Sequence, residues 1–320
     1  MQGEEKNMFY ALVDWGTSSF RLWIVDQNGT VLRESKSDEG MMKASETGFA
    51  AVLERHLNDL GAPAQLPVMI SGMAGARQGW VEAPYLPVPA ALDKLAENAV
   101  RVQHAKRDVR IIPGVAQMQS DAANVMRGEE TQLAGVIKSM PNGLVCMPGT
   151  HCKWVSLHEG QVTGLTSFMT GELFAVLSQH SILKHAIDPA SKFDADTPAF
   201  KRAAEQALQA PEQALSMLFQ VRASQLLGFE QNADGSAHLS GILIGAEIGT
   251  ALRIYGGGKA GLVASDRLNG LYRPIMEKAG FDVTLFDGEK VVRAGLLAAA
   301  SLISSSGASS GPSSVHPSGV

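Results

Sequence analysis

The stretch VDWGTSSFRLWIV, residues 13–25, decides the fold because it contains two strands where one could have run straight through. Residues 9–14 form an apolar run that ends at Asp14, and residues 20–25 alternate Phe20, Leu22 and Ile24 with other side chains. Small and polar residues separate the two runs, as they do at a tight turn. We therefore predict an antiparallel hairpin with one carboxylate at the end of its first strand.

A third strand follows this hairpin. The segment DQNGT contains Asn28-Gly29, a dipeptide that favours a two-residue hairpin turn into VLRES. The prediction is a three-strand antiparallel meander. The same succession of strand, break, strand and turn returns at residues 143–165, GLVCMPGTHCKWVSLHEGQVTGL, as an internal echo of the opening.

The rest of the chain mixes helical and strand patterns, which indicates an α/β protein. We expect helices over 45–60, around 90–103, from 129 onward, through most of 172–231, over 239–256 and over 266–280. Further strands are expected at 67–73, 108–114, 260–265 and 282–286. Residues 304–320 are Ser, Gly and Pro with little to bury, so we expect a disordered tail.

Composition limits the classes of function. The chain has 320 residues, 45% of them apolar, which favours a two-lobed protein with a large core. A net charge of -5 with scattered Lys and Arg argues against nucleic acid or an anionic membrane as a partner and for a small molecule. No long apolar run or basic leader occurs, so we expect a cytoplasmic protein.

The two cysteines and the glycine-rich segments exclude some common sites. Cys146 and Cys152 lack companion ligands for a zinc site or a disulfide framework. Adjacent residues on a strand point to opposite faces, so His151 and Cys152 are a poor nucleophile pair. No Walker A motif occurs. The glycines that match G-x-G-x-x-G follow a helix and precede a strand, so we interpret them as a loop: Gly256, Gly258 and Gly261.

The two echoing hairpins offer another way to bind phosphate. Each predicted turn exposes backbone N–H groups and small hydroxyls, which suit an anion. Asp14 is then placed to hold Mg²⁺, because magnesium binds one or two carboxylates together with phosphate oxygens. Either turn alone could be an ordinary hairpin. Their pairing, order and spacing favour a clamp on a triphosphate chain.

At this point the chain resembles a known family. Strand-Asp-Gly-Thr-strand followed by a second Gly-Thr hairpin is the order of segments in the sugar kinase, hexokinase, Hsp70 and actin superfamily. More narrowly, the sequence is similar to the 2-dehydro-3-deoxygalactonokinase family. The similar strings are VDWGTSSFRLW, SGMAGARQGWVEAPYLPVPA, NVMRGEETQLAG, MPGTHCKWV, MTGELFAVLSQHSIL and LSGILIGAEI.

The resemblance implies a two-lobed actin-like ATPase (ribonuclease H-like) fold with mixed sheets flanked by helices. It places an N-terminal lobe at 1–125, a C-terminal lobe at 126–303 and the tail at 304–320. The implied activity is transfer of the ATP γ-phosphoryl group to the C6 hydroxyl of 2-dehydro-3-deoxy-D-galactonate, with Mg²⁺ as cofactor. Another 2-keto-3-deoxy sugar acid as substrate, or a nucleotide-dependent regulator, stays an alternative, and a homodimer stays open.

The resemblance also implies ATP contacts at both hairpins and in the segment LVASDRLNGLY, where the superfamily binds adenosine. Lys153 is expected to reach a phosphate or the substrate, with an exposed strand lysine as the alternative. The full set expected for ATP is Gly16, Thr17, Ser18, Arg21, Gly149, Thr150, His151, Lys153, Ala264 and Ser265.

For the catalytic base, the family pattern points to the GEET segment. Glu130 is the first choice and Glu129 the second, with N-terminal helix capping as the alternative role and Asp121 as another candidate base. A helix N-terminus lowers the pKa of a carboxyl, so we expect this base to be ionised.

Substrate contacts are expected from the glycine-rich segment after the strand at 67–73 and from the loop that follows it. Arg77 suits a sugar-acid carboxylate, although a surface arginine is the alternative. Packing is the alternative for the two aromatic residues of the set Gly75, Arg77, Trp80 and Tyr85.

Overall fold

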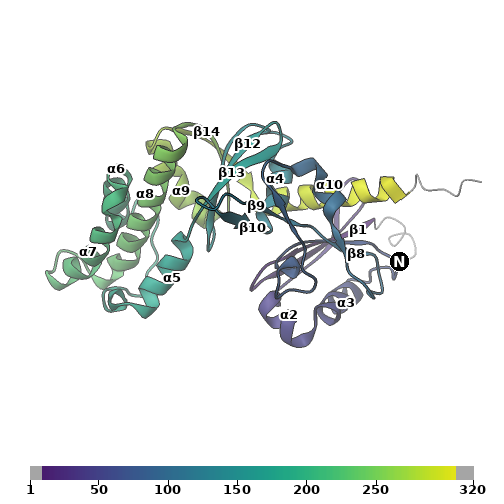
Figure 1. Cartoon of the computed structure of the whole chain (residues 1–320). Helices are drawn as coiled ribbons and strands as arrows, with labels where there is room; N and C mark the ends of the chain where they lie inside the picture. Colours follow the sequence, from purple (N-terminus) through teal and green to yellow (C-terminus); the bar gives the residue numbers. More distant parts are fainter. Residues whose placement is uncertain (1–8, 308–320) are drawn as a thin grey trace, which may run out of the picture. The chain divides into compact units, whose positions relative to one another are not determined.

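A computed structural model of the chain describes residues 9–307 (Figure 1). They form two compact units: the first comprises 9–116, 125–138 and 289–307, and the second comprises 117–124 and 139–288. The units therefore do not follow the single expected cut at residue 125. The first unit includes the helix that begins at Glu129 and the last of the described helices, because both of them pack within it.

The predicted meander forms half of the main sheet of the first unit. Its six strands run in the order β3-β2-β1-β4-β8-β7. β1 pairs antiparallel with β2 and parallel with β4, so Asp14 lies opposite Arg21 on one side and Ser71 on the other. The strands are β1 (Tyr10–Trp15), β2 (Phe20–Val25), β3 (Val31–Ser37), β4 (Val68–Gly72), β7 (Val100–Arg101) and β8 (Val109–Ile111).

Helices and short segments complete the first unit. Apolar residues of β1, β2 and β4 and of the helix α3 share one buried core, which includes Trp15, Phe20 and Leu57. The helices are α2 (Met41–Thr47), α3 (Phe49–Asp59), η1 (Met73–Gly75), η2 (Leu92–Asn98), α4 (Glu129–Val136) and α10 (Gly288–Gly307). The remaining strands are β5 (Tyr85–Pro87), β6 (Ala90–Ala91), β9 (Gly114–Gln117) and β10 (Asn124–Met126).

The second unit repeats the strand order of the first. Its meander β13-β12-β11 continues into the parallel strands β14 and β15, as β3-β2-β1 continues into β4 and β8. The internal echo in the sequence therefore reflects a repeated topology. The strands are β11 (Gly143–Met147), β12 (Cys152–His158), β13 (Gln161–Phe168), β14 (Gly258–Ala264) and β15 (Phe281–Asp287).

Helices of the second unit pack on this sheet and on one another. α8 lies at their centre because apolar and small residues occupy most of its circumference, and fourteen of its residues are buried. The helices are α5 (Thr170–His180), η3 (Ile182–Ala186), α6 (Pro198–Gln209), η4 (Pro211–Gln213), α7 (Ala214–Leu226), η5 (Asn232–Asp234), α8 (Gly235–Tyr255) and α9 (Asp266–Lys278).

Three local expectations are wrong. The single helix over 45–60 is two helices, which Gly48 separates at a φ of +92°. The helix around 90–103 is the short 3-10 helix η2 between two strands, because the buried pattern ends at Ala96 and Val100 pairs with Ile111. α10 continues to Gly307, into the expected tail, and residues 308–320 lie outside the described part of the chain.

α4 and α10 cross closely in the first unit. A Cβ at Gly135 would lie 2.1 Å from the carbonyl oxygen of Val291, and one at Gly295 would lie 1.9 Å from that of Thr131. Only glycine allows this approach, so the pair fixes α10 against α4. Within residues 9–307, none of the helices combines the length and the apolar character that crossing a membrane requires.

Candidate functional site

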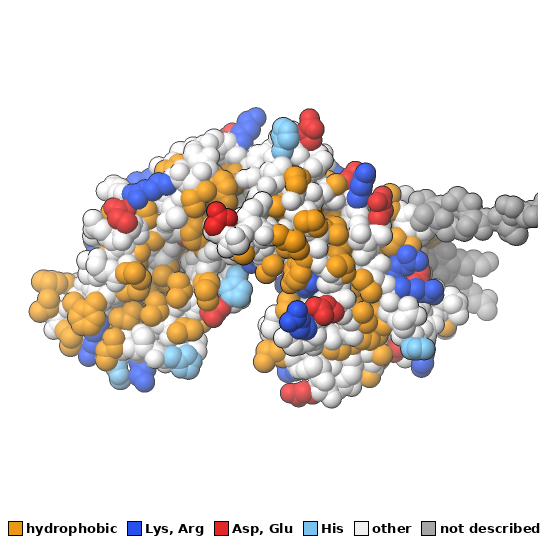
Figure 2. Space-filling view, viewed as in Figure 1, with side chains coloured by type: hydrophobic (Ala, Val, Ile, Leu, Met, Phe, Trp, Pro, Cys, Tyr) orange, Lys and Arg blue, Asp and Glu red, His pale blue; other side chains and the backbone are white. Residues whose placement is uncertain are grey.

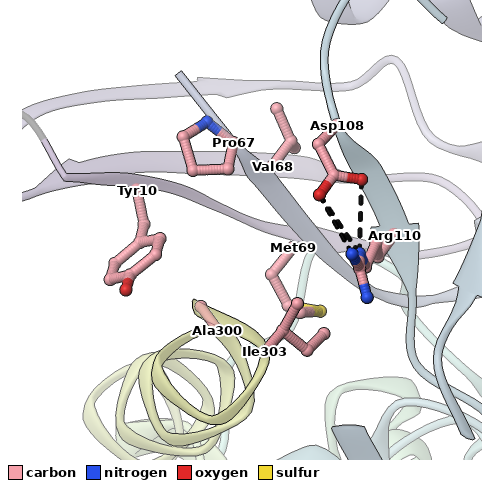
Figure 3. Close-up of a pocket in the computed structure, with 8 residues that line it drawn as sticks. All are labelled: Tyr10, Pro67, Val68, Met69, Asp108, Arg110, Ala300 and Ile303. Carbon is pink, nitrogen blue, oxygen red and sulfur yellow. Dashed lines mark hydrogen bonds and ion pairs between the residues drawn. The ribbon is translucent and has the colours of Figure 1, made fainter. Parts of the chain in front are cut away.

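One pocket of the first unit lies at the amino ends of the parallel strands, where a ligand site of this sheet is not expected. It is lined at the start of β1 and β4 by Tyr10, Val68 and Met69 and on α10 by Ala300 (Figure 3). Its charges are paired, since Arg110 lies 3.2 Å from Asp108. In α/β sheets, ligands bind at the carboxyl ends of the parallel strands. In the first unit, Asp14 lies near that end.

Asp14 is surrounded by charges of both signs. The guanidinium Nη1 of Arg21 lies 3.8 Å from the Asp14 Oδ2, and a quarter of the Asp14 side chain is exposed. Burial raises the pKa of Asp14; Arg21 opposes this increase, and the charges of Glu129 and Glu289 add to it. A cation bound here would relieve the repulsion among these carboxylates.

The turn after Asp14 is held from one side. Gly16 N–H donates to the Ser19 carbonyl at 2.8 Å, while the carbonyls of Gly16 and Thr17 accept from Met41 N–H and Met42 N–H at the start of α2. Thr17 and Ser18 are exposed, and no residue of 9–307 accepts a hydrogen bond from their N–H groups. These donors are therefore available to an anion.

Glu130 does not have the expected properties of a base. Its side chain is fully buried, where its carboxyl accepts from Gly128 N–H at 2.8 Å and from the Thr131 hydroxyl at 3.2 Å. Burial raises the pKa of Glu130 to about 8, and the charge of Glu129 adds to the increase. The expectation of an ionised carboxylate is wrong because desolvation exceeds the stabilisation that the helix start provides.

Glu129 is the more accessible of the two glutamates. It is half-buried, and its Oε2 accepts from Arg127 N–H at 3.0 Å. It also contributes to the field at Asp14. Asp121, the other candidate base, is exposed in a loop of the second unit.

The predicted substrate residues divide into two groups. The Arg77 side chain is 81% exposed and pairs with Glu82 at 3.4 Å, as expected for a surface arginine. Trp80 packs against Trp15 and Phe49 at the edge of the core. Gly75 and Tyr85, in contrast, lie around a second arginine, which the sequence motifs did not indicate.

This second arginine is Arg127, in the MRGEETQ string. Its guanidinium lies 4.3 Å from the centre of the Tyr85 ring, and a Cβ at Gly75 would lie 2.9 Å from its Nη1. Its Nη2 donates to the Ala83 carbonyl at 2.8 Å, whereas its buried Nε and Nη1 have no partner among the described residues. A buried guanidinium without a full set of acceptors is costly, so this site favours an anionic ligand.

The second hairpin turn contacts the start of α5. Glu172 N–H donates to the Thr150 carbonyl at 3.0 Å, and a Cβ at Gly171 would lie 2.4 Å from the Gly149 carbonyl oxygen. Gly149, Thr150 and His151 are exposed, and a Cβ at Gly149 would meet no atom within 4 Å. The turn therefore has a fixed inner side and an open outer side.

Lys153 lies beneath this turn. Its residue is only 5% exposed, and its Nζ donates to the His151 carbonyl at 3.2 Å. The alternative of an exposed strand lysine is therefore wrong. His151 itself is exposed and bonds to Glu172, whereas Cys152 is buried, so the two neighbours point to opposite sides as expected.

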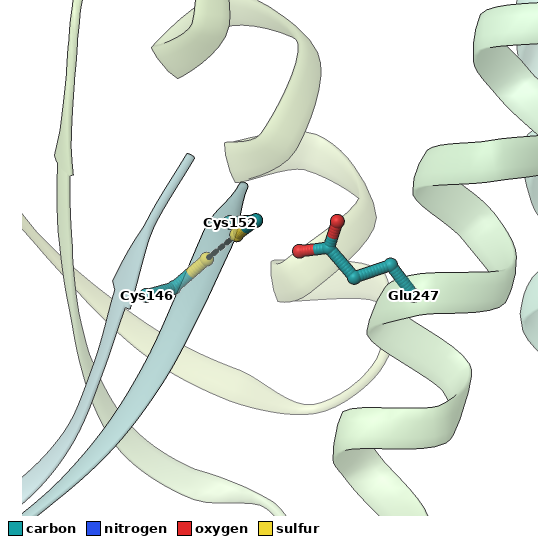
Figure 4. A group of neighbouring side chains, drawn as sticks. All are labelled: Cys146, Cys152 and Glu247. Carbon is teal, nitrogen blue, oxygen red and sulfur yellow. Dashed lines mark hydrogen bonds between the residues drawn. The ribbon is translucent and has the colours of Figure 1, made fainter. Parts of the chain in front are cut away.

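A buried carboxylate connects the elements around the second turn. Glu247 on α8 accepts from Trp154 Nε1 and the Tyr272 hydroxyl, both at 2.9 Å, and from the Thr170 hydroxyl. Cys146 and Cys152 lie beside it with their sulfurs 3.8 Å apart (Figure 4). Burial raises the pKa of Glu247 while these hydrogen bonds oppose the increase. Because the carboxylate already has several donors, this cluster is a structural connection.

Two of these donors also line a pocket of the second unit. The pocket begins at Gly149, passes the start of α5 and continues along α8 and α9. It is mostly apolar, with a few polar groups, as nucleobase and other small-ligand pockets are. Ala264 and Ser265 do not line it; they lie at the end of β14 and at the N-cap of α9. The lining residues include Thr170, Gly171, Phe174, Ser240, Arg267 and Tyr272.

Comparison with known proteins identifies the family. The model of a family described as 2-keto-3-deoxy-galactonokinase matches residues 14–299. A protein of Rhizobium meliloti (strain 1021) assigned as a 2-dehydro-3-deoxygalactonokinase is 50% identical over 92% of this chain and 97% of its own length. The 2-dehydro-3-deoxygalactonokinase of Escherichia coli (strain K12) is 36% identical over 90% and 96%.

Solved structures support the fold. A crystal structure of a Sinorhizobium meliloti protein assigned to the same activity matches with a TM-score of 0.89 at 50% identity, covering 92% of this chain and 99% of that one. The activator of 2-hydroxyisocaproyl-CoA dehydratase from Clostridium difficile matches with a TM-score of 0.52 at 14% identity, covering 96% and 100%. The expected actin-like ATPase fold is thus confirmed, and the chain belongs to the 2-keto-3-deoxy-galactonokinase family of sugar-acid kinases.

Proposed function

We propose that this protein transfers the γ-phosphoryl group of ATP to the C6 hydroxyl of 2-dehydro-3-deoxy-D-galactonate. Membership of the family supports the reaction class. The observation that carries the proposal is the turn after Asp14, where the carbonyls of Gly16 and Thr17 are bound to α2 and the N–H groups of Thr17 and Ser18 are open. Such a turn presents donors to phosphate oxygens next to a carboxylate.

Asp14 is the residue that would hold Mg²⁺. Magnesium commonly takes one or two carboxylates and completes its shell with water and phosphate oxygens, so a single partly exposed aspartate fits it. When bound, the ion supplies positive charge to the phosphate oxygens of the transferring group. Arg21 beside Asp14 adds a second positive charge on the protein.

Glu129 is the proposed base, in place of Glu130. Phosphoryl transfer requires a group that orients the acceptor hydroxyl and accepts its proton. The half-buried Glu129 can meet a ligand, and Arg127 N–H fixes one of its oxygens. Glu130 is enclosed, so its proposed role is to hold the start of α4 through Gly128 and Thr131.

Arg127 is the proposed anchor for the sugar-acid carboxylate. A carboxylate would supply the acceptors that the Nε and Nη1 of Arg127 lack, and a charge-assisted hydrogen bond is stronger than a neutral one. The Tyr85 ring below the guanidinium holds its plane. This arrangement supports an acidic sugar rather than a neutral one.

The second unit supplies the proposed nucleotide contacts. Gly149, Thr150 and His151 present an open turn, and the buried Lys153 adds positive charge beneath it. The adjoining pocket, whose lining includes Phe174 and Arg267, fits the apolar faces and polar edges of adenine. This assignment replaces Ala264 and Ser265 with residues of α5, α8 and α9.

A coupled assay of ADP release tests the proposal. The purified protein is given ATP and Mg²⁺ with each member of a panel of 2-keto-3-deoxy sugar acids that includes the galactonate and gluconate stereoisomers. We expect the highest kcat/KM with 2-dehydro-3-deoxy-D-galactonate, and ³¹P NMR of the product should place the phosphate on C6. ADP release that no sugar acid stimulates would refute the proposal and favour a nucleotide-dependent regulator.

A further inference from the structure

α7 presents an uncovered apolar face. Its other side is buried: Met217 and Val221 pack with Leu239 and Ile242 of α8. The exposed residues are Leu215 (85%), Phe219 (60%) and Leu226 (61%) on the helix and Leu227 (68%) and Phe229 (79%) just after it. Figure 2 shows hydrophobic side chains gathered over α7.

The spacing of these residues makes one continuous surface. Leu215, Phe219 and Leu226 are separated by four and seven positions, so they form one stripe along the helix. Leu227 and Phe229 extend the stripe past the helix end. We call these five residues the α7 patch.

The size of the α7 patch matches half of a dimer interface. With about 200 Å² for a phenylalanine and about 100 Å² for a leucine, its exposed apolar surface is on the order of 500 Å² per copy. Two copies would bury on the order of 1,000 Å² of apolar area. Since roughly 60% of an interface is apolar, the whole contact would reach about 1,600 Å², the usual size of a stable interface.

The charge pattern favours a second copy of this chain over a charged partner. Residues 213–229 contain one charged side chain, Arg222, and its Nη1 already donates to the His185 carbonyl and the Gln225 Oε1. A two-fold contact places each patch against itself, so a patch with several like charges would repel its own copy. Arg222 lies on the same face, three positions after Phe219 and four before Leu226, so each copy brings one guanidinium to the contact, and in an antiparallel arrangement it falls opposite Phe219 of the other copy.

We infer that two copies of this protein dimerise through their α7 helices about a two-fold axis. Antiparallel packing of the two stripes brings Leu215 of one copy toward Leu226 of the other, with Phe219 near the axis. The patch excludes every residue assigned above to phosphate, metal or sugar acid, so the dimer and the kinase reaction can be tested separately.

Light scattering coupled to size exclusion tests the dimer on the full chain. We expect a mass of twice 33.9 kDa at micromolar concentrations.

Phe219→Asp should raise the dimer dissociation constant by at least about 100-fold, because each substitution enters the interface twice. The matched control is Ile254→Asp on α8, since Ile254 is 54% exposed and lies outside the patch. Both variants should keep the circular dichroism spectrum and kcat of the parent.

A cross-link tests the two-fold arrangement. Gln220 is exposed beside Phe219, whereas Cys146 and Cys152 are buried and protected from reagents. Gln220→Cys should give a covalent dimer with a short bismaleimide, and the parent should not. A parent protein that is monomeric at 100 μM, or a dimer that Phe219→Asp does not weaken, overturns the inference. Equal weakening by Ile254→Asp also overturns it.

Discussion

Tyr272 on α9 donates a 2.9 Å hydrogen bond to the carboxylate of Glu247 on α8, and both side chains are buried. The same carboxylate accepts from Trp154 on β12 and Thr170 at the start of α5. Glu247 therefore joins four elements that surround the second hairpin turn and the pocket beside it.

Glu247→Ala is expected to destabilise the protein by about 3 kcal/mol or more, because it leaves three buried donors without an acceptor. Since Thr170 and Tyr272 line the proposed nucleotide pocket, KM for ATP should rise about 10-fold while KM for the sugar acid changes little. Urea denaturation and steady-state kinetics measure both effects. Glu277→Ala, which removes an exposed carboxylate of α9, is the control. Equal increases in both KM values would contradict the role of Glu247 in the nucleotide pocket.

Asp14→Asn should lower kcat by at least about 100-fold without unfolding the protein, because the amide keeps the shape and loses the negative charge that would hold Mg²⁺. Mg²⁺ titration of the rate and circular dichroism provide the measurements. Asp38→Asn, at an exposed aspartate paired with Lys43, should leave the rate unchanged. A rate near that of the parent in Asp14→Asn would remove Asp14 from the metal site.

Glu129→Gln should lower kcat by about 100-fold or more and change KM for either substrate little, because it removes a base without removing volume. Glu130→Gln should have the smaller effect on kcat, since an amide can replace a protonated buried carboxyl. Parallel steady-state kinetics of the two variants decide between the glutamates. Loss of kcat in Glu130→Gln alone would restore Glu130 as the base.

Glu130 also predicts a pH dependence of stability. Its pKa of about 8 in the folded chain exceeds the ordinary value of 4.5, so between these values the folded state binds more protons than the unfolded state. The free energy of unfolding should therefore fall as the pH rises from about 4.5 to about 8, by at most about 1.4 kcal/mol per pH unit from this group. Glu130→Gln should reduce this slope, and Glu97→Gln, at an exposed position, should not. Urea denaturation at several pH values measures the slope.

Arg127→Met should raise KM for the sugar acid by at least about 10-fold and leave KM for ATP nearly unchanged, because only the former carries the carboxylate that Arg127 is proposed to bind. Arg77→Met is the matched control, since Arg77 is a surface residue of the same unit. Arg127→Lys should rescue part of the loss, as a point charge without the planar fork. Equal effects of Arg127→Met and Arg77→Met on KM would exclude the proposed anchor.

Much of the fold can be predicted because its signals are local. The break after Asp14, the Asn28-Gly29 turn and the repeat at residues 143–165 each follow from short-range backbone preferences, and the structure contains both meanders. The division of the chain into units is harder to predict. It depends on contacts between residues that lie far apart in the sequence, such as Gly295 and Thr131. No short sequence pattern around either residue predicts such a contact.

The same distinction between local signals and distant contacts applies to the site residues. The turn residues Thr17, Ser18 and 149–151 are exposed and Gly16 is half-buried, in keeping with the small and polar character of both turns. The burial of Glu130 and Lys153 depends on neighbours from other elements, so a charged side chain at either position gives no sign of it. Arg127 was missed because its distinguishing feature, a guanidinium with unpaired nitrogens over the Tyr85 ring, exists only after the loop at 85 and the start of α4 meet.

The tight crossing of α4 and α10 has a consequence for synthesis. α10 is the last of the described elements, and Gly295 allows it to contact the Thr131 carbonyl of the first unit directly. A ribosome therefore delivers the whole second unit before the first unit receives α10. All residues of the second unit, 117–124 and 139–288, are made before the rest of α10, so this unit can fold before α10 is complete. The first unit must wait for α10 with an open apolar surface, so we expect the nascent N-terminal half to depend more on chaperone protection.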